Sequence, residues 1–193
     1  MRLSLTCLIF ATATIAADPF DDCPSEAFLV QGGNATLYGV NLAIGEYHTE
    51  AAHLGTSNKV NGFGFSVHDR YLYGWDYSNG NLARIGKDYV VQPLAATGFP
   101  STSFYVGDVS VTENAYYGYR KGSEYGLFRA SLDPASTDFL EATKVENSAS
   151  MNLNIFDLAF HPDENFAYSV DSNGFLHKIN VTTGTSSNLG YTG

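Results

Sequence analysis

Three polar residues, Asn61, Asp108 and Asp157, precede or begin short apolar runs in distant parts of the chain. Amide and carboxylate oxygens are the ligands that Ca²⁺ takes, about six to eight at a time. If the three runs are strands around one axis, their first residues meet at one mouth of a central channel and form a candidate Ca²⁺ site. The alternative is that these side chains bind turn backbones or face water, and the sequence has no Asp-x-Asp-x-Asp loop to favour the metal.

The same oxygens would serve an alternative function, that of a calcium-dependent hydrolase similar to lactonases or esterases with a carboxylate as base. The five histidines lack the spacing of zinc ligands, such as His-x-x-x-His. His161 precedes Pro162 in a turn and His177 lies in the middle of an expected strand, and we expect both to be surface or turn residues rather than ligands. No serine lies in a Gly-x-Ser-x-Gly elbow. We therefore expect a protein that is not an enzyme, and we assign neither a catalytic residue nor a cofactor beyond the candidate Ca²⁺.

The N-terminal 17 residues have the pattern of a secretory signal peptide. Arg2 supplies the positive charge, residues 3–15 are apolar apart from Ser and Thr, and small residues allow cleavage after Ala16 or Ala17. The apolar stretch is short for a membrane span, and no later segment is long and apolar enough to be one. The sequence thus predicts a secreted, extracellular protein whose mature domain covers residues 18–193.

Cysteines and glycosylation motifs fit this compartment. Cys7 would leave with the signal, so Cys23 is a disulfide candidate whose partner lies on another chain or on chain outside this sequence, the alternative being a free thiol. Asn34-Ala35-Thr36 and Asn180-Val181-Thr182 match the acceptor pattern for N-glycans. Asn34 and Asn180 are therefore candidate glycosylation sites of a glycoprotein.

The charge balance excludes some partners. The 193 residues include 10 Lys and Arg against 20 Asp and Glu, a formal net charge of -10. Phosphate binding needs clustered cations, so we expect no nucleic acid and no docking on anionic lipid. With 44% hydrophobic and 16% charged residues, the chain is long and apolar enough to fold around a core.

Self-comparison of the sequence identifies the elements that must position these residues. Four segments share an aromatic-rich strand, a turn with glycine, and a second strand around a leucine. These leucines are 45, 45 and 49 residues apart, at Leu37, Leu82, Leu127 and Leu176. A period in the forties with several strands per unit is typical of β-propeller blades. Aromatic side chains would fill the space between stacked blades.

The repeat predicts an all-β propeller with about four four-stranded blades, near residues 24–56, 57–99, 103–147 and 153–193. A strand precedes three of the hairpins, but the segment before the first is too short and polar, so the first blade is incomplete. We expect closing strands at His53-Leu54-Gly55 and Asn188-Leu189-Gly190. Open edges invite pairing, so we expect a partial ring completed by missing chain or a partner subunit, a complete four-bladed ring being the alternative.

The order of motifs resembles an uncharacterised family of extracellular β-propeller-like repeat domains, described as a domain of unknown function. The similarity spans nearly the whole mature chain and includes residues 23–29, 36–42, 60–64, 71–75, 104–109 and 157–162. It implies a propeller fold and a place in large secreted or cell-surface proteins. It brings no activity and no catalytic residues.

Together these features predict a secreted, non-enzymatic propeller module for extracellular adhesion, binding or surface-structure assembly. Loops such as Tyr77-Ser78-Asn79-Gly80-Asn81 carry side chains that suit a protein or carbohydrate ligand, although they also suit ordinary turns.

Overall fold

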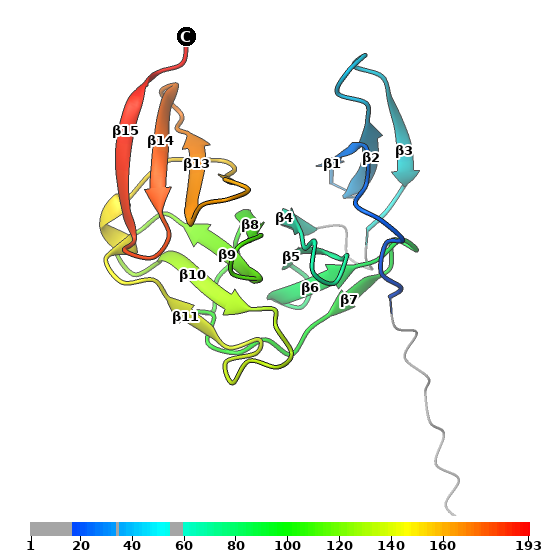
Figure 1. The fold of residues 1–193 in the computed structure, drawn as a ribbon, viewed down its shortest axis with the longest axis horizontal. Helices are drawn as coiled ribbons and strands as arrows, with labels where there is room; N and C mark the ends of the chain where they lie inside the picture. The colour runs from blue at the N-terminus through cyan, green and yellow to red at the C-terminus, as the bar shows by residue number, and fades with distance from the viewer. Residues whose placement is uncertain (1–16, 34, 55–59) are drawn as a thin grey trace, which may run out of the picture.

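The computed structural model describes residues 17–33, 35–54 and 60–193, and within them the chain is all-β. Four antiparallel sheets follow one another along the chain (Figure 1). The first and fourth sheets form two arms that stand apart, and the second and third form the base between them (Figure 1). This open arc of consecutive sheets is the expected partial propeller.

The first sheet has three strands and each of the others has four, paired in chain order. The described residues also contain one 3₁₀ helix, η1 (Ser148–Met151), a single turn that could not span a bilayer. The strands are β1 (Ala27–Gln31), β2 (Thr36–Val40) and β3 (Tyr47–Ala51) in the first sheet; β4 (Val60–Phe65), β5 (Leu72–Asp76), β6 (Asn81–Ile85) and β7 (Val91–Pro93) in the second; β8 (Val106–Ser110), β9 (Ala115–Arg120), β10 (Gly126–Ser131) and β11 (Ala142–Lys144) in the third; and β12 (Ala159–Phe160), β13 (Phe166–Val170), β14 (Phe175–Asn180) and β15 (Thr185–Tyr191) in the fourth.

Aspartate–glycine turns join the central strands of the second and fourth sheets. Asp76 Oδ1 accepts the backbone N–H of Ser78, and Asp171 Oδ1 accepts that of Asn173. Gly80 then takes a φ of 59°, which a residue without a side chain adopts at little cost. These local signals set the hairpin register that places the repeated leucines opposite the aromatic strands.

The sheets stack by one rule. We call the face toward the next sheet along the chain the forward face and the opposite one the rear face. Residues paired across strands share a face, and the forward face of each of the first three sheets forms a buried apolar cluster with the rear face of the following sheet. The clusters join Leu37 with Leu72 and Ile85, Tyr73 and Leu82 with Tyr116, and Tyr117 and Leu127 with Ala167 and Ile179.

The repeated leucines show where the stack ends. Leu37, Leu82 and Leu127 are fully buried, whereas Leu176 is half-buried. All four lie on forward faces, and the forward face of the fourth sheet has no following sheet among the described residues. Leu37, Leu82 and Leu127 are core residues because the following sheet covers them. Leu176 is not, because no described sheet follows the fourth.

One expected strand lies elsewhere. The closing strand of the first sheet is β3, which ends at Ala51, so the expectation of a closing strand that includes His53 and Leu54 was wrong, and Gly55 lies outside the described residues. Leu54 is instead a fully buried plug beside Leu37, and its N–H donates to the carbonyl of Ala35. Among the described residues, the first sheet has no counterpart of the innermost strand that β4, β8 and β12 supply elsewhere, which agrees with the expected incomplete first blade.

Candidate functional site

The carboxylate of Asp108 joins the third and fourth sheets. Oδ1 accepts the backbone N–H of Val109 at 2.7 Å, and Oδ2 accepts that of Phe160, on β12, at 3.0 Å. Burial raises the pKa of Asp108 to about 7 against these two hydrogen bonds, with a smaller contribution from the charge of Asp157. The side chain thus clamps two neighbouring innermost strands, and both of its oxygens are engaged by protein donors.

Asp157 lies just before β12, and its Oδ1 accepts the N–H of Leu158 at 2.8 Å. Partial desolvation raises its pKa, although the residue is exposed to solvent. The negative charge of Asp157 is one of the smaller causes that raise the pKa of Asp108. A Ca²⁺ site at this pair stays a prediction, since backbone donors occupy three of the four carboxylate oxygens.

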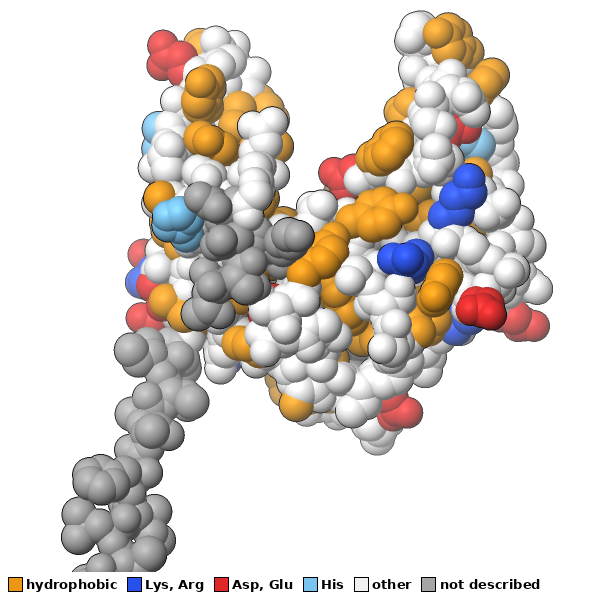
Figure 2. All heavy atoms as spheres, turned by 180° about the vertical axis from the view of Figure 1, so that it is seen from behind, with side chains coloured by type: hydrophobic (Ala, Val, Ile, Leu, Met, Phe, Trp, Pro, Cys, Tyr) orange, Lys and Arg blue, Asp and Glu red, His pale blue; other side chains and the backbone are white. Residues whose placement is uncertain are grey.

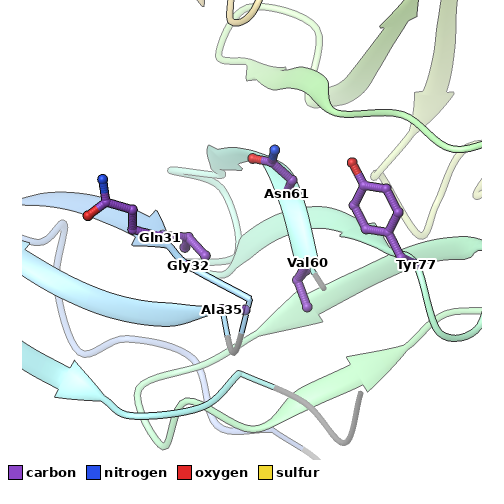
Figure 3. A pocket seen from close by; sticks show the side chains of 7 residues that line it. Gln31, Gly32, Ala35, Val60, Asn61 and Tyr77 are labelled. Carbon is purple, nitrogen blue, oxygen red and sulfur yellow. The ribbon is translucent and has the colours of Figure 1, made fainter. Parts of the chain in front are cut away.

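Asn61, the third candidate metal ligand, lies on β4 and is exposed. It lines a cavity of about 390 Å³ between the first and second sheets, with Gln31, Tyr77 and Val60 (Figure 3). In Figure 3 the amide of Asn61 and the hydroxyl of Tyr77 point to the same side of this cavity. The cavity offers amide and phenol groups rather than carboxylates, which suits a neutral polar ligand better than a cation.

The remaining sequence candidates have distinct environments. Cys23 is exposed and forms no disulfide within the described residues. Asn34 lies outside the described residues, and Asn180 accepts the N–H groups of Thr182 and Thr183 with its Oδ1. The glycan and disulfide assignments stay predictions.

His177 lies within strand β14, as expected, but the expectation that it is a surface residue was wrong. It is buried on the rear face of the fourth sheet, and its Nε2 lies 3.0 Å from Asp171 Oδ2. This contact fixes the turn after β13, so the histidine is structural.

Sequence reasoning missed a cluster of metal-ligating side chains on the first sheet. Glu26, His48 and Glu50 each place one ligand atom within 4.8 Å of the other two. His48 and Glu50 lie two apart on β3, so the period of a strand puts them on one face. The spacing of His48 and Glu50 was the only signal from which the sequence could have indicated part of this cluster. Glu26 is brought next to them only by the pairing of β1, β2 and β3.

The two ends of the stack carry exposed apolar faces, and Figure 2 shows hydrophobic side chains at the surface of both arms. On the rear face of the first sheet, Leu29, Tyr38, Val40 and Tyr47 line a cavity of about 330 Å³. On the forward face of the fourth sheet, a hollow of about 460 Å³ is lined by Phe156, Leu158, Tyr168, Val170 and Leu176, among others. Within the stack, faces of these two kinds are covered by neighbouring sheets.

Residues 28–193 match the family described as a repeat of unknown function (DUF6923). The chain belongs to this family. No curated protein matches the DUF6923 chain at a significant level. The resemblance noted from the sequence is confirmed for the family and the fold, and its extracellular aspect stays a prediction.

The DUF6923 chain is also similar to solved structures. It shares 12% identity with U3-55K (TM-score 0.50, 85% of this chain and 48% of that one) and 11% with the RRP9 WD40 repeats (0.50, 85% and 47%). A protein of unknown function from Bacteroides thetaiotaomicron shares 18% (0.51, 81% and 42%). These likenesses are of fold alone and confirm the β-propeller class. The chain spans less than half the length of these structures.

Proposed function

We propose that this chain is a secreted, non-enzymatic assembly module that completes its ring of blades with a second copy of itself. The observation that carries the proposal is the pair of exposed apolar faces at the two ends of the stack. The forward face of the fourth sheet would pack on the rear face of the first sheet of the partner. The signal-like N-terminus and the two glycosylation motifs support the secreted location in this proposal.

The fourth sheet repeats the forward-face chemistry of the third. Tyr119 and Leu127 fill the interface between the third and fourth sheets. The same repeat positions in the fourth sheet are Val170, which is 45% exposed, and Leu176. A β-sheet face with aliphatic residues at these positions is complementary to a rear face of the same repeat. Leaving this apolar surface in water is less favourable than burying it in such a contact.

The first sheet likewise repeats the rear-face chemistry of the fourth. Ala167 and Ile179 are buried against the third sheet. Their repeat equivalents in the first sheet are Ala27 and Val40, which lie beside Leu29, 46% exposed. The two free faces are thus the two halves of one kind of contact, which favours a second copy as the occupant of both.

The pairing of unlike faces also limits how copies can assemble. Contacts between unlike faces give a closed assembly only if the rotation from one copy to the next leads back to the first copy. Two copies that exchange both contacts form such a closed assembly. The partner would then also be able to add a strand at β1, which pairs with β2 alone among the described residues.

Light scattering after gel filtration measures the mass of the mature protein in solution and tests the proposal. The wild type should be a dimer, and Val170→Asp and Leu29→Asp should each give monomers, because a charge buried in an apolar contact is costly. Val67→Asp is the matched control, since Val67 is 46% exposed and lies on neither face. A monomeric wild type at roughly 100 µM, an upper range for a specific micromolar contact, would overturn the proposal.

Mixing the two variants tests which faces meet. Each Val170→Asp chain keeps its rear face and each Leu29→Asp chain keeps its forward face, so the mixture retains one intact contact per pair. Partial recovery of dimer is therefore expected on mixing. No recovery would contradict a contact between unlike faces.

The assignment as a non-enzyme has its own test. The alternative hydrolase would turn over lactones or esters in the presence of Ca²⁺, and Asp108→Ala or Asp157→Ala would abolish the turnover. Detection of such activity in the wild type, lost in these variants, would replace the present proposal.

A further inference from the structure

Two glutamates and one histidine converge on the forward face of the first sheet. His48 Nε2 lies 2.9 Å from Glu50 Oε1 and 3.6 Å from Glu26 Oε2. Glu50 is held from the second sheet by the hydroxyl of Tyr89, which donates to its Oε2 at 2.7 Å. His48 and Glu50 come from β3 and Glu26 from the residue before β1, so the cluster spans the sheet.

Gly39 on β2 makes the space for this cluster. It is paired with Phe28 on one side and with His48 on the other. A Cβ at Gly39 would lie 2.5 Å from Glu26 Oε2 and 3.0 Å from Glu50 Oε1. The three side chains therefore meet over the one residue of the central strand that has no side chain.

The other three sheets put a cation at this position. The residue two after the repeated leucine is Arg84, Arg129 or Lys178 in the second, third and fourth sheets. Arg129 binds Glu113 and Asp138 at 3.0 and 2.9 Å, and Lys178 lies 3.5 Å from Glu164. Each basic residue is on the forward face of its own sheet, and a tyrosine of the preceding strand in the sequence is paired with it.

The first sheet has glycine where its neighbours have a cation, yet it gathers two carboxylates there. In the described part of the chain, no Lys or Arg forms an ion pair with Glu26 or Glu50. The exchange of a basic side chain for glycine, together with an added histidine, leaves a place for a cation that the described residues do not supply.

We propose that Glu26, His48 and Glu50 bind one divalent transition-metal ion, Zn²⁺. One imidazole and two carboxylates are a donor set that Zn²⁺ accepts, whereas Ca²⁺ takes oxygen ligands alone. Zn²⁺ holds such ligands at about 2.0–2.1 Å, which sets neighbouring ligand atoms of a tetrahedron roughly 3.4 Å apart. The observed 2.9 and 3.6 Å bracket that spacing.

The ion would fasten the first sheet. It would tie the segment before β1 to the outer strand β3 and, through Glu50 and Tyr89, to the second sheet. The His48 side chain is 56% exposed, so the fourth coordination position is open to water. The site lies on the forward face and does not depend on the proposed dimer, which uses the rear face.

Zn²⁺ titration of the tag-free mature chain by calorimetry tests the site. We expect one ion per wild-type chain and a rise in melting temperature, because an ion that binds only the folded chain stabilises it. His48→Ala and Glu50→Gln should weaken binding by roughly tenfold or more. His53→Ala is the matched control, an exposed histidine outside the cluster, and should bind as the wild type does.

Gly39→Arg is the decisive variant, since it restores the side chain of the other sheets. Gly39 does not have a positive φ, and the nearest groups are ends of flexible side chains, so the variant should fold. It should bind no Zn²⁺ and should be at least as stable as the ion-free wild type. Wild-type binding no tighter than that of His48→Ala, or full binding by Gly39→Arg, would overturn the site.

Discussion

Asp108 places a carboxylate where two sheets meet, and its protonation should be visible in the stability of the whole chain. Its pKa is raised from 3.8 to about 7 in the folded state, mainly by burial. The folded chain then holds the proton more tightly than the unfolded chain. This contribution to stability is complete below pH 4 and is lost as the pH rises to about 7.

Asp108→Asn should therefore reduce the fall in unfolding free energy between pH 4 and pH 7. The difference should be at most a few kcal/mol, because one pKa unit corresponds to about 1.4 kcal/mol and the residue is partly exposed. Urea denaturation at pH 4, 5.5 and 7 measures it. An unchanged pH dependence in the variant would show that Asp108 is not the group responsible.

Single residues also show what the sequence could not reveal. His177 gives no hint of burial, because its contact with Asp171 exists only once the hairpin between β13 and β14 has formed. Glu26 is 22 residues from His48, and only the three-strand pairing brings them together. Asp108, in contrast, was identified from its place before an apolar run, although its role as a clamp required the position of Phe160.

At the scale of the element, the repeated leucines should divide into two classes. Leu127 is fully buried between sheets, so Leu127→Ala should cost about 2–5 kcal/mol of stability. Leu176 is half-buried, and Leu176→Ala should cost clearly less in dilute, monomeric protein. Chemical denaturation of both variants checks this, and equal losses would mean that the fourth sheet is covered by something else in the monomer.

Turn glycines give a second prediction for the elements. Gly184 has a φ of 66°, and a Cβ there would lie 2.0 Å from the carbonyl oxygen of Glu146. Gly80 has a similar φ of 59° but nothing within 4 Å. Gly80→Ala should cost about 1 kcal/mol from backbone strain alone, and Gly184→Ala should cost more because the backbone beside η1 must move.

Thermal melts of the two glycine variants make the comparison. Equal shifts in melting temperature would contradict the close packing of the fourth-sheet hairpin on the third sheet.

The elements were the most predictable level of this fold. The period of the leucines and the glycine turns are local or near-local signals, and they identified the hairpins of all four sheets. The closing strand of the first sheet was misplaced because polar Tyr47–Ala51 has no apolar alternation to mark it. The prediction placed the strand at Leu54 instead, because the residue type alone does not distinguish a buried leucine in a loop from a buried leucine in a strand.

For the molecule as a whole, the open arc raises the question of which sheets are stabilised by a neighbour. The middle sheets are covered on both faces, whereas the first and fourth sheets are each covered on one. Amide hydrogens exchange through local or sub-global opening, and opening is easier where fewer apolar contacts must be broken. In the monomer, β2 and β14 should thus exchange faster than β5 and β9.

Raising the protein concentration should then protect the two end sheets selectively. A second copy packed on the rear face of the first sheet and the forward face of the fourth would slow exchange in β2 and β14, while β5 and β9 already lie inside the stack. Hydrogen exchange followed by mass spectrometry at low and high concentration measures this, with Val170→Asp as the chain that should show no concentration dependence. Protection that rises equally in all four sheets would mean that association, if present, does not use the ends of the stack.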